Sequence, residues 1–337
     1  MNKFNKILFF YTLMTGSLIS ISSYSWFSMW MGLEINLLAM IPLIYNSKNL
    51  FSSEAALKYF ITQALASGIL LFSIILMTNS SEFLPQNSNY WLMMMMNSAL
   101  MTKVGAAPFH SWFPEVLEGM NWMNGLIMLT WQKIAPMVLL MYSVNMTVFF
   151  SSIVIFSSTI GSILGLNQIS MRKIMAYSSI NHIGWMIAAL MNSQFTWMIY
   201  FLIYSFISVN IIFMLNYFNI FNISQISNSI NMNKPLKIFF MMNFLSLGGV
   251  PPFLGFFPKW LVINELVKNN LILVSLILII LALVTLFFYL RLTISTIVIS
   301  SSEFLTPSKE SLSFFFILCN FFMLAGLALC VLVFNFN

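Results

Sequence analysis

The sequence predicts an all-α, polytopic membrane protein with about eleven transmembrane helices. Three observations support this fold class: the composition, the length of the apolar stretches and an interruption that occurs in two of them. The chain of 337 residues is 60% hydrophobic and 7% charged, whereas a soluble domain carries about 25% charged residues. So few charged residues cannot cover a soluble protein, and no sizeable soluble domain is expected.

The apolar stretches mark the expected membrane segments, because a spanning helix needs about 20 apolar residues. They fall at residues 5–22, 25–45, 53–78, 90–119, 122–143, 148–167, 173–191, 195–219, 237–266, 271–297 and 312–334. The first stretch lacks a convincing signal-peptide cleavage site, so we expect it to be a retained helix. The connections are short and rich in Asn and Ser, as in NSSEFLPQNSN and NISQISNSINMNK.

Basic residues in the connections predict the orientation of the chain, because Lys and Arg collect on the non-translocated side of a membrane. The N-terminal side of the predicted topology holds Lys3, Lys6, Lys48, Lys58, Arg172, Lys173, Lys234, Lys237, Arg291 and Lys309. Only Lys268 falls on the opposite side. The N-terminus is therefore expected on the cytosol-like side and the C-terminus opposite it. The net charge of +6 reflects this bias, and no basic patch with interleaved aromatic residues indicates a nucleic-acid partner.

Two segments, 90–119 and 237–266, contain the same interruption. PFHSWFPE starts at Pro108 and PFLGFFPK starts at Pro252, 144 positions later. Each lies in the fourth of five segments, which predicts five-helix repeats over residues 1–143 and 148–297, followed by a loop and one C-terminal helix over 298–337. An odd number of helices inverts the second copy, and inverted repeats with discontinuous helices are typical of secondary transporters. A chance match is the alternative, but the matched position favours a repeat.

Glu34, Lys103, Lys133 and Lys259 lie within predicted membrane segments and are not among the residues that set the orientation. The first three are roughly 14–20 Å from the start of their segments, near mid-membrane. A charge there costs about 2.5–3.5 kcal/mol, so we expect these residues to have partners or a function. A lysine that alternately gains and loses a carboxylate partner can take up and release a proton. Glu34 is the only carboxylate near the midplane of the first repeat, so Glu34–Lys103 is the expected pair.

Each candidate also has a purely structural interpretation. Lys259 could extend to the membrane surface, although its place in the repeated motif favours a function. His182 could be a hydrogen-bonded core residue, but histidine titrates near neutral pH and its segment is the counterpart of the one that holds Glu34. His110 lies at the first interruption and could either relay protons or hold loose backbone. Lys58 is expected to be an interface residue.

The sequence indicates no metal site and no redox cofactor on this chain. Cys319 and Cys330 lie eleven positions apart in one apolar segment, which is about 16 Å along a helix and beyond the reach of a disulfide. No motif typical of dinucleotide or ATP binding occurs. We therefore expect the chain to bind no cofactor of its own.

Several stretches resemble a known family of membrane proteins. They are LMTKVGAAPFHSWFPEVLEGM, NQISMRKIMAYSSINHIGWM, FLSLGGVPPFLGFFPKWLVINEL, WMGLEINLLAMIPLI and TWQKIAP. These stretches are similar to the mitochondrially encoded NADH dehydrogenase subunit 2 family, in the form found in insects. Its members are antiporter-like subunits of the membrane arm of respiratory complex I. The resemblance spans essentially the whole chain. Bacterial members have three further N-terminal helices outside the two repeats, and this chain is expected to begin at their fourth helix, so the proposed channel should be retained.

The resemblance implies an activity and a role for each candidate residue. The activity is proton translocation from the mitochondrial matrix to the intermembrane space, as a subunit of proton-translocating NADH:ubiquinone reductase driven by distant quinone reduction. By matching motifs, Glu34 and Lys103 form the carboxylate–lysine pair and Lys133 is the central lysine. His182 belongs to the polar axis between the half-channels, and Lys259 lies near the exit.

The resemblance also implies the surroundings of the chain. NADH, flavin, iron–sulfur clusters and ubiquinone are expected on other subunits, and the partners are other membrane-arm subunits and the lipid of the mitochondrial inner membrane. The N-terminus then faces the matrix. Two alternatives stay open. A free-standing cation/proton antiporter would need oxygen ligands for a hard cation, and the midplane offers only Glu34 as a clear carboxylate. A structural spacer of the membrane arm would conduct no protons.

Overall fold

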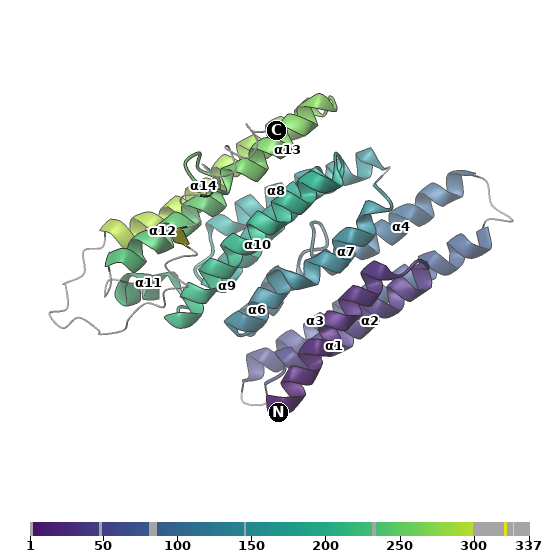
Figure 1. The fold of residues 1–337 in the computed structure, drawn as a ribbon, viewed down its shortest axis with the longest axis horizontal. Coiled ribbons are helices and arrows are strands. Elements are labelled where there is room, and N and C mark those ends of the chain that lie inside the picture. Colours follow the sequence, from purple (N-terminus) through teal and green to yellow (C-terminus); the bar gives the residue numbers. More distant parts are fainter. Residues whose placement is uncertain are drawn as a thin grey trace. The chain divides into compact units, whose positions relative to one another are not determined.

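The structure is a computed structural model that describes residues 3–46, 49–80, 86–144, 146–230 and 234–298, together with residues 320, 321 and 326. The described part is nearly all helical (Figure 1). Its helices are α1 (Lys3–Ser22), α2 (Trp26–Ile44), α3 (Leu50–Ser80), α4 (Gln86–Val104), α5 (Trp112–Gly119), α6 (Trp122–Leu129), α7 (Trp131–Met141), α8 (Thr147–Leu166), α9 (Met171–Leu190), α10 (Gln194–Tyr217), α11 (Ile223–Ile230), α12 (Lys234–Gly248), α13 (Phe256–Lys268) and α14 (Ile272–Val298).

The chain divides into two compact units, Met1–Ile153 and Val154–Asn337. In the first unit, α2 packs between α1 and α3, α3 contacts α4 and α5, and α7 contacts α1, α4 and α6. In the second unit, α10 packs against α9, α12 and α13, and α14 covers α12 and α13. The division falls inside α8, so the predicted repeat boundaries at residues 143 and 148 stay a prediction.

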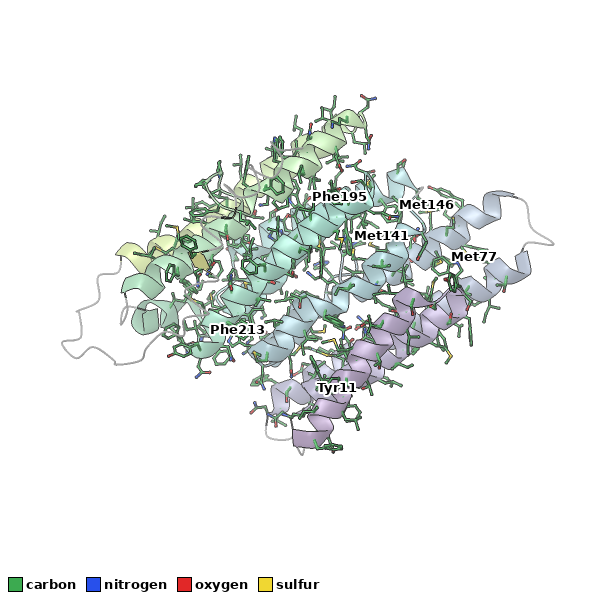
Figure 2. The ribbon with its side chains drawn as sticks, in the orientation of Figure 1. Tyr11, Met77, Met141, Met146, Phe195 and Phe213 are labelled. Carbon is green, nitrogen blue, oxygen red and sulfur yellow. The ribbon has the colours of Figure 1, made fainter. Side chains whose placement is uncertain are left out.

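The helices have the length and surface of a polytopic membrane protein. Six of the described helices are apolar and long enough to cross a membrane: α1, α2, α3, α8, α10 and α14. Their outer faces carry large apolar side chains, such as Tyr11 on α1 and Phe213 on α10, which are 65% and 43% exposed (Figure 2). Such faces suit a lipid environment, which solvates apolar surface as water cannot.

Most of the predicted segments coincide with helices, and both predicted interruptions occur. Segment 90–119 is divided into α4 and α5, and segment 237–266 into α12 and α13. Two local expectations were wrong. The connection NISQISNSINMNK contains the helix α11, and segment 122–143 is not continuous but divided into α6 and α7. The predicted segment 312–334 lies outside the described residues except for positions 320, 321 and 326.

The division between α6 and α7 has a local cause. Thr130 separates the two helices with φ −114° and ψ −75°, which departs from the helical values near −63° and −42°. Its hydroxyl donates to the carbonyl of Leu126 at 2.8 Å. Pro136 lies inside α7 and cannot donate to the carbonyl of Gln132 four residues earlier. Lys133 therefore lies between two irregularities of the backbone.

Candidate functional site

The first helix break follows the end of α4. Gly105 has φ +83°, a left-handed conformation that glycine adopts without the steric cost other residues meet. The backbone N–H groups of Gly105 and Ala106 both donate to the carbonyl of Met101 at 3.0 Å. The indole N–H of Trp112, at the start of α5, donates to the carbonyl of Thr102 at 3.1 Å. These bonds satisfy carbonyls that the end of a helix leaves without partners.

The second break follows the end of α12 and has the same backbone. Gly249 has φ +79° and lies 144 positions after Gly105. The N–H of Val250 donates to the carbonyl of Leu245 at 3.3 Å, as that of Ala106 does to Met101 in the first break. Both breaks are therefore built on a left-handed glycine three positions before the repeated Pro-Phe pair.

Lys259 lies in the first turns of α13 and points into the second break. Its Nζ donates to the carbonyls of Gly248 at 2.8 Å and Leu247 at 3.3 Å, and it lies 5.8 Å from the centre of the Trp185 ring. The side chain is buried. The carbonyls belong to the last turn of α12, the negative end of that helix. The break thus provides a binding site for an ammonium group instead of letting it reach a surface.

Lys103 and Glu34 belong to neighbouring parts of the first unit. Lys103 is buried in the last turn of α4, and Glu34 is half-buried on α2. The two side chains are close enough to interact electrostatically, but they form no ion pair within 4.0 Å. The structure therefore brings the predicted partners near one another without direct contact.

Lys133 is the most deeply buried of the three lysines, with 1% of its surface exposed. It lies at the start of α7 and its Nζ is 5.9 Å from the centre of the Phe113 ring, which belongs to α5 just after the first break. The amide of the neighbouring Gln132 donates to Oδ1 of Asn36 at 2.8 Å. This bond ties α7 to α2, the helix that also carries Glu34.

His182 lies on α9, a helix that is buried along nearly its whole length. Its Nδ1 is 2.9 Å from the hydroxyl of Tyr200, and the ring of Tyr204 packs against the imidazole with 5.0 Å between ring centres. Both tyrosines belong to α10. His182 and Lys259 lie in the second unit, while Glu34, Lys103 and Lys133 lie in the first.

Some features of the site were not predicted from the sequence. Lys58, for which the sequence predicted only an interface position, forms ion pairs with Glu54 and Glu115, both at 2.7 Å. The spacing of Glu54 and Lys58, four positions on one helix, is a signal that could have revealed the first pair. His110 lies with its Nδ1 3.3 Å from the carbonyl of Pro108, and its predicted roles as a relay or as a backbone support stay predictions. Among the described residues, no three ligand side chains gather as a metal site.

The two broken helices and their buried lysines place the chain in a class of antiporter-like membrane proteins. The model of the family described as NADH:quinone oxidoreductase/Mrp antiporter, transmembrane, matches residues 23–285, and the chain belongs to this family.

Within this family the chain is similar to insect proteins named NADH-ubiquinone oxidoreductase chain 2. It is 47% identical to that of Anopheles gambiae over 99% of both chains, and 49% identical to that of Aedes aegypti over 99% of both chains. It also resembles a chain in the structure of respiratory complex I from Thermus thermophilus with bound aureothin. That match has a TM-score of 0.88 and 25% identity, and it covers 99% of this chain and 80% of that one.

Proposed function

We propose that this chain is a proton-translocating subunit in the membrane arm of mitochondrial NADH:ubiquinone oxidoreductase. The observation that carries the proposal is the burial of ionisable groups at or beside backbone interruptions. Lys103 lies in the last turn of α4 before the first break, Lys133 follows the division between α6 and α7, and Lys259 points into the second break. A buried lysine is costly in a membrane, and one beside a helix interruption can exchange partners with carbonyls that the helix itself leaves without a donor.

The proposed sequence of events follows the order that the family resemblance implies. A change in the Glu34–Lys103 interaction alters the field at Lys133, which then gains or loses a proton from the matrix side. The proton passes by way of His182 to Lys259 and leaves on the opposite side. Because the surroundings have a low dielectric constant, a change of charge at one group is felt strongly by the next. No step requires a redox centre on this chain.

The same proposal covers the surroundings of the chain. Oxidation of NADH and reduction of ubiquinone then take place on other subunits, which bind the flavin and the iron–sulfur clusters. The chain spans the mitochondrial inner membrane with about eleven helices, a number set by the apolar stretches, and its two five-helix units are inverted copies. The excess of basic residues on the N-terminal side supports a matrix location for the N-terminus.

Substitution of the central lysine tests the proposed function. In the assembled complex reconstituted in vesicles, we expect Lys133→Ala to lower the number of protons pumped per electron. Lys268→Ala is the matched control, because Lys268 is exposed at the end of α13. An unchanged ratio in the Lys133 variant would leave the chain a structural spacer. Sodium-driven proton exchange by the isolated chain would make it an antiporter instead.

A further inference from the structure

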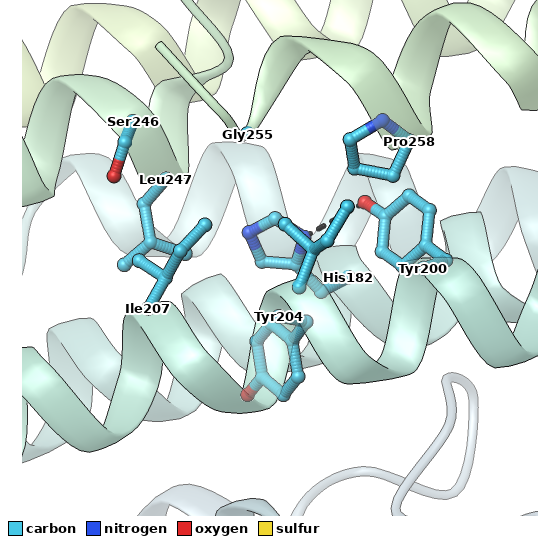
Figure 3. A pocket seen from close by; sticks show the side chains of 9 residues that line it. His182, Tyr200, Tyr204, Ile207, Ser246, Leu247, Gly255 and Pro258 are labelled. Carbon is cyan, nitrogen blue, oxygen red and sulfur yellow. Dashed lines mark hydrogen bonds between the residues drawn. The ribbon is translucent and has the colours of Figure 1, made fainter. Parts of the chain in front are cut away.

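The second unit contains a hydrogen bond between two titratable side chains, His182 and Tyr200. The hydroxyl of Tyr200 and Nδ1 of His182 are 2.9 Å apart and buried (Figure 3). Tyr200 is 1% exposed and His182 4% exposed. The hydroxyl of Tyr204, by contrast, points away from the imidazole (Figure 3). Of these two neighbouring tyrosines, only Tyr200 therefore meets the imidazole through its hydroxyl.

A tyrosine hydroxyl can serve both protonation states of a histidine. It donates to Nδ1 when that nitrogen carries no proton, and it accepts from Nδ1 when the imidazole is charged, because both ring nitrogens are then donors. Phenylalanine has the same shape and can do neither. The Tyr200 hydroxyl thus lets the buried His182 gain and lose a proton without losing its hydrogen-bond partner.

The surroundings connect this pair to the second helix break. Tyr200 stacks on Trp185, with 12° between the ring planes. Lys259 Nζ also lies over the Trp185 ring, 5.8 Å from its centre. A small cavity adjoins His182, Tyr200 and Ser246. The space open to the centre of a water molecule is about 10 Å³, near the least that holds one water. Ser246 directly precedes Leu247, whose carbonyl accepts a hydrogen bond from Lys259.

We propose that Tyr200 is a positioning residue for proton transfer at His182. Its hydroxyl holds the imidazole in one orientation, facing the cavity that leads to the break, in both the neutral and the charged state. Nδ1 keeps its proton and donates to the hydroxyl in both states, so the transferred proton is gained and lost at Nε2 and none is left on the tyrosine. This inference rests on the proposed function, because it requires His182 to carry protons.

The test compares three variants in the assembled complex reconstituted in vesicles. Tyr200→Phe removes the hydroxyl and keeps the ring that stacks on Trp185. Tyr59→Phe is the matched control, since Tyr59 is also a buried tyrosine but lies on α3 in the first unit. His182→Gln removes the titrating group. We expect Tyr200→Phe to lose as many pumped protons per electron as His182→Gln, at an unchanged amount of complex, and Tyr59→Phe to lose none.

A second readout separates positioning from packing. Proton transfer through a badly oriented imidazole should become more rate-limiting, so the solvent deuterium isotope effect on pumping should rise in Tyr200→Phe and stay unchanged in Tyr59→Phe. Normal pumping by Tyr200→Phe beside impaired pumping by His182→Gln would overturn the role of Tyr200 and leave the proposed function intact. Normal pumping by His182→Gln would remove His182 from the pathway, and with it the role of Tyr200.

Discussion

The two helix breaks share a backbone conformation but satisfy their freed carbonyls with different side chains. In the first break, the neutral indole of Trp112 donates to the carbonyl of Thr102. In the second, the ammonium of Lys259 donates to the carbonyls of Leu247 and Gly248. Both breaks thus expose the negative end of a half-helix, and in the second one an ammonium group donates directly to its carbonyls.

The matched position of the repeat explains this difference. Glu115 in PFHSWFPE corresponds to Lys259 in PFLGFFPK. Glu115 turns outward to Lys58 at 2.7 Å, with 54% of its side chain exposed, because a carboxylate would be repelled by the carbonyls of the break. Lys259 is attracted by the same carbonyls and turns inward. The repeated motif therefore fixes the backbone of each break, and the sign of one charge decides what the break can hold.

The largest expected effect comes from substitution of Gly255, because the second break has no room for a side chain at this position, whereas the matched position of the first break carries one. A Cβ at this position would lie 1.8 Å from the carbonyl oxygen of Ser246, so the backbone would have to move. We expect Gly255→Ala to destabilise the chain by about 3 kcal/mol, the upper range for overpacking. The amount of chain in the assembled complex and its melting temperature measure this loss.

The matched position in the first break provides the control. Ser111 corresponds to Gly255 in the repeat and is exposed, so Ser111→Ala should leave assembly unchanged. Equal tolerance of both substitutions would mean that the second break has no tighter backbone packing than the first.

The next largest effect separates two roles of Lys259. Lys259→Met removes the ammonium group that donates to the carbonyls of Leu247 and Gly248. We expect a loss of about 1–3 kcal/mol, the cost of leaving a buried polar group without its partner. Lys259→Gln keeps an N–H donor but cannot carry a proton at neutral pH. We therefore expect the Gln variant to assemble normally while both variants lose proton pumping, measured as protons per electron.

Either of two results would contradict this division. Poor assembly of Lys259→Gln would show that the positive charge itself holds the break together. Normal pumping by Lys259→Gln would show that Lys259 only caps α12, as Trp112 caps α4, and the two breaks would then be equivalent.

The sequence predicted the features that depend on local chemistry. Composition predicted a helical membrane protein, and the paired Pro-Phe motifs predicted both breaks, because proline interrupts a helix wherever it occurs in the helix interior. The division at Thr130 was not predicted from the sequence. Pro136 lies in the same stretch, TWQKIAP, but one proline inside an apolar segment does not by itself show where the helix is divided.

The partners of the buried residues could not be predicted in the same way. Trp185 and Lys259 are far apart in the sequence, and their contact depends on how α9 packs beside α13. The pairing of Tyr200 with His182 likewise depends on the packing of α10 against α9. Glu34 was paired with Lys103 because it is the only carboxylate near the midplane of the first repeat. The structure places the two side chains near each other but not in an ion pair. Long-range packing decides such geometry, and no local pattern encodes it.

The smallest expected effect concerns the outward charge of the first break. Lys58 pairs with Glu54 and Glu115 at 2.7 Å, and all three side chains are at least 40% exposed. Exposed ion pairs contribute little and are screened by salt. We expect Lys58→Met to lower the melting temperature of the complex slightly at low salt and not at high salt, with proton pumping unchanged.

A double-mutant cycle shows whether this pair matters to the break at all. Glu115 belongs to α5 and Glu54 to the same helix as Lys58, so only the pair with Glu115 ties the half-helix after the break to α3. Combining Lys58→Met with Glu115→Gln should give less than the sum of the single effects, while Glu54→Gln alone should change little. A loss of pumping in Lys58→Met would be the more informative outcome. It would mean that the outward charge of the first break, like the inward charge of the second, takes part in proton transfer.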